Sequence, residues 1–324
     1  MLGFVDRLKK FRTFGQFASD LGWEHGEGFI VGQSGNLSPA AHLTGQPLLP
    51  SEALTANGID EDSITEVDDC LFKTAYTPRR FSPPMLLIRE HMDMDCATWF
   101  SNYLTYKNKI VGINGEKPSD ASFLAEMENW IKKEKNPLRA FAAAISVRLF
   151  TQKATTLSEI DILSLPYPEN KELSISPHER IIVEDIVGYY RDLIRLGEKS
   201  AILKEPGIEA LPAFNDVFVN RINGIYNKNK LCPLEAHVWP GVVCQPYAFG
   251  EGLVDWTGAD DLKGKIDTLL KEKRGDALNV TRIARIYDGA CIYLLKPNRL
   301  RYWLRSVALR DADETLADLA AQGF

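Results

Sequence analysis

The segment VTRIARIYDGACIYLL, from Val280 to Leu295, carries the clearest structural signal in the sequence and predicts a β-hairpin. Its two halves are rich in β-branched and aromatic residues, and they meet at Asp288-Gly289, a pair suited to the positive φ angles of a type I′ turn. Downstream, the apolar spacing predicts a helix over Ala312–Ala321. A hairpin followed by a helix indicates a chain that mixes both kinds of structure.

Helix start signals and short apolar runs extend this pattern upstream. Capping boxes predict helices that begin at Thr13-Phe14-Gly15-Gln16 and Ser176-Pro177-His178-Glu179, and Asn136-Pro137 joins a cap to a first-turn proline. The runs Met85–Ile88 and Lys109–Ile113, bounded by Pro, Asn and Gly, predict strands. Because strands and helices alternate without a regular βαβ period, we expect an α+β (mixed α/β) fold.

A boundary between two domains is expected near residues 164–178. Ser164-Leu165-Pro166-Tyr167-Pro168 ends an apolar segment, and the polar run Glu169–Glu172 follows it. Two prolines flanking a tyrosine cannot continue a helix and suit an extended exit from a domain. The predicted domains are residues 1–170, with short strands and packed helices, and residues 176–324, a smaller unit of helices and the hairpin.

The composition is that of an ordinary globular protein. Of the 324 residues, 45% are hydrophobic and 25% charged, which excludes wholesale disorder. No apolar run approaches the roughly 18 residues of a membrane span, and Met1–Arg12 lacks the apolar core of a signal peptide. Five widely spaced cysteines, an odd number, predict reduced and buried thiols in a cytoplasmic protein without membrane contact. The net charge of -6 means that any nucleic-acid role must rest on a local patch or a partner.

Motifs that carry catalysis are weak or missing in the sequence. Neither G-x-x-x-x-G-K-[ST] nor G-x-S-x-G occurs. Cys232, His237 and Cys244 are conceivable zinc ligands, but their spacing lacks C-x-x-C. The carboxylates of Asp311–Glu314 are interpreted as favourable charges at a helix start. We therefore expect no catalytic residue and no metal site in this chain.

The run Ser82-Pro83-Pro84-Met85 is close to the N-P-P-Y motif of amino-methyltransferases. That motif holds the target amino group and stacks an aromatic ring on the flipped base. Met85 replaces the aromatic residue here, and the run precedes a predicted strand, whereas the motif follows one. This chain alone is therefore not expected to methylate a base.

Several phrases of the sequence resemble the C-terminal target-recognition region of type IIG-like N6-adenine DNA methyltransferases and related restriction–modification enzymes. The phrases are GQPLLP (Gly45–Pro50), PPMLLIRE (Pro83–Glu90), LTYKNKIVGI (Leu104–Ile113), KATTL (Lys153–Leu157), DILSLPYP (Asp161–Pro168), KPNRLRYWLR (Lys296–Arg305) and RDADET (Arg310–Thr315).

The resemblance implies a DNA-sequence reader of a phage-defence system that acts on double-stranded DNA. The first domain would be target-recognition-like. The catalytic methyltransferase part, with its S-adenosylmethionine site, would lie elsewhere in the polypeptide or on a partner. No cofactor is expected in the chain itself.

Eight basic residues are the candidate DNA contacts: Arg79, Arg80, Arg89, Lys107, Lys109, Lys153, Arg301 and Arg305. Arg79 and Arg80 lie in a proline-bounded loop, where forked guanidinium groups can reach guanine edges or phosphates. Lys107 and Lys109 flank Asn108 on a predicted strand, so both lysines are expected on one face. Solvated surface charge is an equally open interpretation for each residue.

Arg301 and Arg305 are four residues apart and would share a face of a helix, with Tyr302 and Trp303 between them. Interleaved aromatic and cationic side chains can stack on nucleic acid. The favoured interpretation is instead structural: Trp303 covers a core while the arginines pair with acidic residues of Asp311–Glu314.

Two other functions stay open. A protein-interaction scaffold within a defence complex is consistent with the net charge of -6. A nuclease fragment would need an acidic pair near E-x-K or D-x-K, and Asp68-Asp69 followed by Phe72-Lys73 is a poor match.

Overall fold

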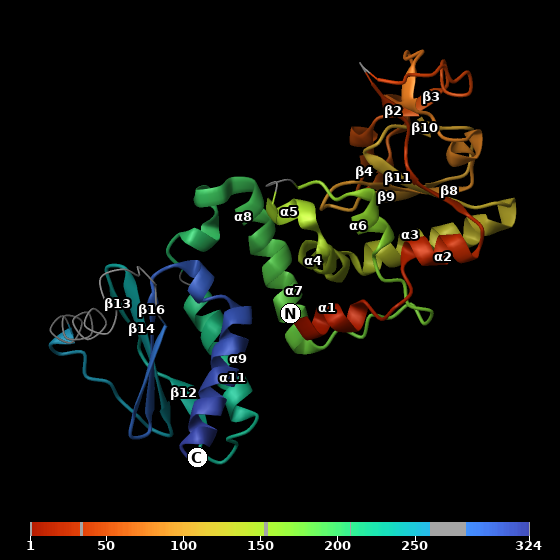
Figure 1. Ribbon diagram of the computed structural model, residues 1–324. Helices are drawn as coiled ribbons and strands as arrows, with labels where there is room; N and C mark the ends of the chain where they lie inside the picture. Colours follow the sequence, from red (N-terminus) through yellow and green to blue (C-terminus); the bar gives the residue numbers. More distant parts are fainter. Residues whose placement is uncertain (1, 33–34, 152–154, 208, 260–282, 324) are drawn as a thin grey trace. The chain divides into compact units, whose positions relative to one another are not determined.

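The computed structural model (Figure 1) describes residues 2–32, 35–151, 155–207, 209–259 and 283–323. The chain forms two compact units, Met1–Val187 and Gly188–Phe324. Both contain helices and small sheets, which confirms the predicted α+β fold class. Among the described residues, no helix is both long enough and apolar enough to cross a membrane.

The first unit combines seven helices with eleven short strands among its described residues. The helices are α1 (Leu2–Leu8), α2 (Phe14–Asp20), α3 (Ala121–Lys133), α4 (Lys135–Ile145), α5 (Val147–Thr151), α6 (Glu159–Leu163) and α7 (Pro177–Asp185). The strands are β1 (Glu24–Glu27), β2 (Ile30–Val31), β3 (Pro47–Leu49), β4 (Leu54–Thr55), β5 (Gly58–Ile59), β6 (Thr65–Glu66), β7 (Phe72–Thr74), β8 (Met85–Arg89), β9 (Cys96–Trp99), β10 (Thr105–Tyr106) and β11 (Ile110–Asn114).

An antiparallel sheet in the order β1-β11-β8-β9 forms the centre of this unit. The predicted strands at Met85–Ile88 and Lys109–Ile113 become its two inner strands, β8 and β11. Tyr106 packs against β11 where Gly112 lacks a side chain, because a Cβ there would collide with the phenol. Its buried hydroxyl donates to the Arg80 carbonyl at 3.0 Å. Glycine is therefore required at this position of β11.

The capping signals in the sequence place the helix starts well. Thr13 and Ser176 both form the predicted capping boxes, at the starts of α2 and α7. The helix predicted from Asn136-Pro137 begins one residue earlier, at Lys135, and ends before Ser146. Local side-chain-to-backbone bonds explain this accuracy, since they need no distant contact.

The first unit ends at Val187, later than the expected boundary near residues 164–178. Tyr167 does not leave the first domain: it is buried and stacks on Phe14, with ring centroids 5.3 Å apart. The helix α7 also belongs to the first unit, because Arg7 donates to both carboxylate oxygens of Glu179 at 2.9 Å.

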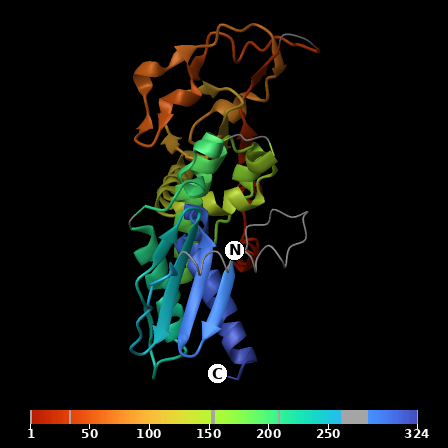
Figure 2. The ribbon, with the colours of Figure 1, turned by 90° about the vertical axis from the view of Figure 1, so that its left-hand side faces the viewer.

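The second unit is a sheet with two long helices on one face (Figures 1 and 2). Its strands are β12 (Leu231–Pro233), β13 (His237–Trp239), β14 (Val242–Phe249), β15 (Ala284–Asp288) and β16 (Cys291–Pro297). They run antiparallel in the order β12-β14-β16-β15, with β13 also paired to β14. The helices are α8 (Arg191–Leu196), α9 (Ala210–Asn223) and α11 (Arg305–Ala321). Phe214, Phe218, Tyr247, Leu294 and Trp303 form the core between sheet and helices.

The predicted hairpin is present as β15 and β16, although its turn is displaced by one residue. Asp288 pairs with Cys291, so the two turn residues are Gly289 and Ala290. Gly289 has φ of 55°, a conformation that favours glycine. The first residues of the predicted segment, 280–282, lie outside the described part of the chain.

The expectation that all cysteines are buried is wrong for Cys70 and Cys232, which are exposed. Cys291 is half-buried. Cys96 and Cys244 are buried, and burial raises the pKa of each thiol to about 12. Cys232 lies on β12, where an apolar neighbour in sequence does not fix the face of the strand, and Cys70 lies in the loop before β7.

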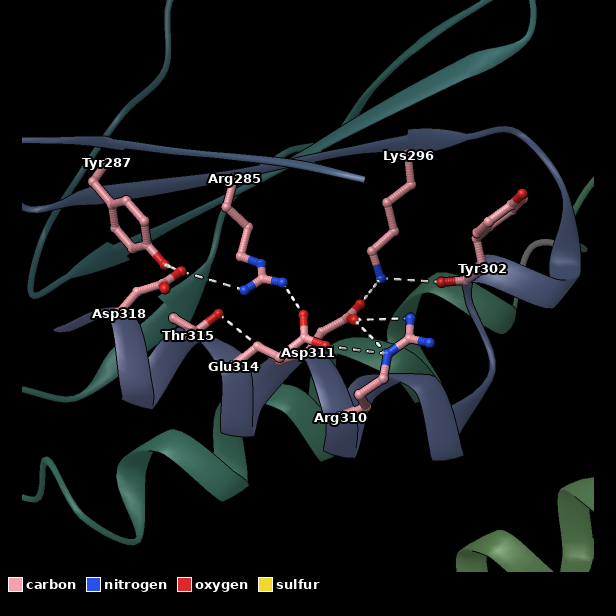
Figure 3. A network of polar contacts seen from close by, with 9 residues as sticks. All are labelled: Arg285, Tyr287, Lys296, Tyr302, Arg310, Asp311, Glu314, Thr315 and Asp318. Atoms are coloured by element: carbon pink, nitrogen blue, oxygen red, sulfur yellow. Dashed lines mark hydrogen bonds and ion pairs between the residues drawn. The ribbon is translucent and has the colours of Figure 1, made fainter. Parts of the chain in front are cut away.

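A polar network joins α11 to the sheet (Figure 3). Asp311, Glu314 and Asp318 lie along one face of α11, opposite cationic and phenolic groups of β15 and β16. Arg285 bonds Glu314 and reaches Asp318 at 3.3 Å, and the Tyr287 hydroxyl donates to Asp318 at 2.7 Å. These carboxylates lie inside a helix that begins seven residues before the predicted start. The interpretation of Asp311–Glu314 as charges at a helix start is therefore wrong.

The ion pair between Lys296 and Asp311 lies at the centre of this network, with both side chains fully buried. The ammonium also donates to the Tyr302 carbonyl at 3.0 Å. It lies 3.9 Å from the ring centroid of Phe214 and 4.7 Å from that of Trp303. Burial lowers the pKa of Lys296 to about 8, against the opposing charge of Asp311. The ammonium thus has a counter-charge, a carbonyl acceptor and two aromatic faces.

We expect Asp311→Ala to lower the free energy of unfolding of the second unit by about 3–5 kcal/mol, because a buried ammonium loses its counter-charge. Urea unfolding with hydrogen exchange of residues 305–321 would measure the change. Asp313→Ala is the matched control: it removes an exposed carboxylate bonded to Arg221, and it should cost less than about 1 kcal/mol. Equal losses in the two variants would contradict a special role for the buried pair.

Candidate nucleic-acid interface

The structure separates the candidate DNA contacts of the first unit into two places. Arg79 lies in the 3-10 turn Pro78–Phe81, where it is exposed, donates to the Gly22 carbonyl at 3.0 Å and lies 3.6 Å from Glu116. Glu116 follows the end of β11, whereas Lys109 precedes its start. Five strand residues separate these positions by roughly 17 Å. Arg79 and Lys109 therefore do not form one patch.

Arg80 is a structural residue of the first unit and is only 7% exposed. It bonds the Glu24 carboxylate at 2.7 and 3.1 Å and the Glu27 carbonyl at 2.9 Å. Its guanidinium lies 4.4 Å from the ring centroid of Tyr76. The expectation that Arg80 reaches DNA beside Arg79 does not hold, because its donors are occupied within the fold.

Lys107 and Lys109 are exposed, but they do not share a strand face as expected. Asn108 and Lys109 form a turn between β10 and β11, since the chain must reverse between Tyr106 and Ile110. Lys107 pairs with Asp69 at 3.1 Å. This pairing reduces the charge that Lys107 offers to a phosphate.

Arg89 is half-buried at the end of β8, beside Ile110 in the sheet. Hydrogen bonds from its own backbone and from Ser51 lower the pKa of Glu52, and the charges of Lys109 and Arg89 add to this effect. Arg89 and Lys109 thus share an acidic neighbour. Lys153 lies outside the described residues.

Arg301 and Arg305 do not lie on one helix. Arg301 belongs to the 3-10 turn Leu300–Tyr302, and Arg305 is the first residue of α11. The Arg301 guanidinium donates to the Tyr302 hydroxyl at 2.7 Å and lies 4.8 Å from the centroid of the Tyr302 ring. Trp303 is buried, with 1% of its surface exposed, as the structural interpretation predicts.

The acidic partners foreseen for these arginines are occupied by other cations. Asp311 pairs with Lys296 and Arg310, Asp313 with Arg221, and Glu314 with Arg285 and Arg310. Among the described residues, none of these ion pairs involves Arg301, so the predicted pairing does not hold for Arg301.

The units differ in charge, although each has 19 lysines and arginines. The first unit carries 26 acidic residues, a net of -7, and the second carries 18, a net of +1. Phosphate binding needs a local positive potential. A unit with a net charge of +1 repels phosphate less than one with a net charge of -7.

A pair of carboxyl groups in the first unit, from buried Glu90 and half-buried Glu27, was not foreseen from the sequence. Glu90 follows β8 and is 5% exposed, and its Oε1 has no hydrogen-bond partner among the described residues. Burial, together with the charge of Glu27 and a hydrogen bond to it, raises the pKa of Glu90 to about 9. Arg148 opposes this shift and Glu159 adds to it. Glu90 is thus protonated at neutral pH and able to donate a hydrogen bond.

Gly26 of β1 leaves no space for a side chain beside this carboxyl pair. A Cβ on Gly26 would collide with the carboxylate of Glu159 and the guanidinium of Arg80, so both groups lie directly against β1. In the sequence, Glu90 is a single acid after a strand, and Glu27 and Glu159 are far from it. Only the sheet, which pairs β1 with β11 and β11 with β8, brings Glu27 and Glu90 together.

The conceivable zinc ligands Cys232, His237 and Cys244 do not form a metal site. Cys232 is exposed, Cys244 is buried, and His237 stacks on Trp256 with ring centroids 4.9 Å apart. In the described part of the chain, no group of three or more His, Cys, Asp or Glu side chains is arranged to hold a metal ion.

Comparison of the chain with models of protein families, with curated proteins and with solved structures finds no match.

We expect Glu90→Gln to reduce the pH dependence of stability. In the unfolded chain Glu90 ionises near pH 4.5, but in the folded protein only near pH 9. Unfolding between these values therefore releases a proton, and the stability contributed below the unfolded pKa is lost progressively as pH rises towards the folded pKa. Glutamine does not ionise. The melting temperature of the variant, minus that of the wild type, should increase from about pH 5 to about pH 9.

Glu116→Gln serves as the control, because Glu116 is exposed and lies beside Arg79. Its difference from the wild type should stay flat over the same range. A flat difference for Glu90→Gln as well would show that Glu90 ionises normally in the folded protein.

Proposed function

We propose that this chain is a DNA-sequence-reading module of an adenine-N6 DNA methyltransferase or restriction–modification system in phage defence, without catalysis of its own. The segment Arg299–Arg305 of the second unit, which we call the arginine segment, is its main contact with the phosphate backbone. The observation that supports this proposal most directly is the way in which the arginine segment folds.

The arginine segment combines buried apolar residues with basic residues that are exposed or half-buried. Leu300, Trp303 and Leu304 are 9%, 1% and 2% exposed and anchor the segment in the core. Arg299 is exposed, and Arg301 and Arg305 are half-buried. Three guanidinium groups thus come from the 3-10 turn and its two ends, and forked guanidinium groups are well suited to phosphate.

The start of α11 adds to this surface. Arg305 opens a helix of 17 residues, and its N-cap residue, Leu304, provides no side-chain hydrogen bond to the first turn. The helix dipole at such an end favours an anion. Lys204 lies close to the same turn, because its carbonyl accepts from the Leu300 amide at 2.8 Å.

The turn at Lys107–Lys109 is a second contact in this proposal. Its lysines are exposed, and a phosphate would take the place of Asp69 beside Lys107. Base contacts would come from other side chains, since phosphate contacts position a protein without reading sequence. The phrases shared with target-recognition regions support the assignment of an adenine methyltransferase partner, which would hold S-adenosylmethionine and the catalytic residues.

A protein-interaction scaffold is the second candidate function. The net charge of -7 on the first unit and the ion pairs of Lys107 and Arg79 favour it. A chain that forms a stable complex with a methyltransferase subunit but has no affinity for DNA at low salt would select this alternative.

We expect the double variant Arg301→Ala/Arg305→Ala to weaken duplex binding about tenfold at ~0.1 M salt. The slope of log K against log salt should fall in magnitude by about 2, because two phosphate contacts are lost. Fluorescence anisotropy with a randomised duplex, followed by selection of bound sequences, measures affinity and sequence preference together.

Arg221→Ala is the matched control, since it removes an arginine that pairs with Asp313 on the surface. It should leave the salt slope unchanged. Duplex binding that is unaffected by the double variant would reject the arginine segment as the phosphate contact, and no binding at low salt would reject an autonomous reader.

A further inference from the structure

A cavity of about 720 Å³ opens in the second unit, and no part of the proposed DNA contact uses it. It lies beside the C-terminal ends of α9 and α11 and the turn of the β15–β16 hairpin. Pockets for small organic ligands fall in the range of roughly 300–1,000 Å³. Its size therefore suits a small molecule with room for ordered water.

The floor and walls of the cavity are apolar and aromatic. Ile292 and Leu319 are buried beneath it. Tyr226 and Phe249 line it with their rings 5.8 Å apart at 63°, and Tyr287 lines it from β15. The Tyr287 hydroxyl is held by Asp318 at 2.7 Å, so this ring is fixed in position. Fixed aromatic faces favour a flat ring that stacks on them.

The mouth of the cavity is polar. Asn227, Lys228, Asn229 and Gln322 line it and are exposed. Side-chain amides pair with the edges of nucleobases through matched donors and acceptors. Lys228 forms no ion pair with the described residues, and no carboxylate occurs among the described residues that line the cavity.

From this combination we infer that the cavity binds a nucleotide, with the base against Tyr226, Phe249 and Tyr287 and the phosphate beside Lys228. Flat aromatic walls, amide groups at the mouth and one cation match a base and its phosphate. A fatty acid would leave the amides without partners. Both a free mononucleotide and a nucleotide within a single strand present this chemistry. The inference rests on residues separate from the arginine segment and does not depend on the proposed function.

The test is isothermal titration of the full chain with AMP, GMP, CMP and TMP, with the matching nucleosides and with inorganic phosphate. Mononucleotides should bind more tightly than either fragment. Lys228→Ala should weaken mononucleotide binding about threefold and leave nucleoside binding unchanged, as expected for one exposed ion pair. Lys230→Ala is the matched control, because Lys230 is equally exposed but does not line the cavity.

A second measurement tests whether the nucleotide binds in the cavity. Cys291 lines the cavity, whereas the exposed Cys70 belongs to the first unit. AMP should slow alkylation of Cys291 by iodoacetamide and leave Cys70 unaffected, as measured by peptide mass spectrometry. Ile225→Trp, at a lining position that is 58% exposed, should fill the mouth and weaken binding at least about tenfold.

A short single-stranded oligonucleotide distinguishes the two sources. Tighter binding of the oligonucleotide than of any mononucleotide assigns the site to a strand, and the reverse assigns it to a free nucleotide. Absence of mononucleotide binding at millimolar concentration overturns the inference. So does binding that leaves Cys291 unprotected and is insensitive to Ile225→Trp. Absence of duplex binding at low salt would overturn the autonomous DNA reader and leave this inference untouched.

Discussion

The buried ion pair between Lys296 and Asp311 is the constraint on which the second unit depends. A charge that is fully removed from water must be matched by an opposite charge and by hydrogen bonds. Lys296 meets this demand with Asp311, the Tyr302 carbonyl and the faces of Phe214 and Trp303. These groups come from β16, the 3-10 turn, α11 and α9. One ammonium thus fixes the relative positions of four elements.

The same constraint shapes the arginine segment. Because Lys296 requires the Tyr302 carbonyl and the Trp303 ring, the chain between β16 and α11 must turn inward at these residues. In this stretch Arg299 is exposed and Arg301 is half-buried. The position of the arginines that we propose as phosphate contacts is therefore a consequence of how the core satisfies a buried charge. Lys296 and the arginines of the arginine segment lie within ten residues of each other in the sequence.

In the first unit, Arg80 is a buried cation that needs a counter-charge and hydrogen bonds in the same way. Its guanidinium bonds Glu24 and the Glu27 carbonyl and lies on Tyr76, so it joins the 3-10 turn to β1. Close by, Glu90 keeps a proton, because burial and the charge of Glu27 outweigh the opposing charge of Arg148. The charge of Arg80 is therefore neutralised by pairing, whereas Glu90 is neutralised by protonation. Neither outcome follows from residue type alone.

The sequence by itself determined the elements that depend on local physics. The capping boxes at Thr13 and Ser176, the apolar runs that form β8 and β11, and the glycine of the hairpin turn are set by neighbours within a few residues. The α+β fold class follows from them. Tertiary structure decided what depends on distant partners. Arg79 and Arg80 are adjacent in sequence, yet one is exposed and the other buried, because only Arg80 meets Glu24. Tyr167 stays in the first unit because Phe14 receives it. The Glu27–Glu90 pair and the cavity beside Tyr287 exist only after strands and helices from separate parts of the chain have packed together, since no local pattern encodes the distance between their side chains.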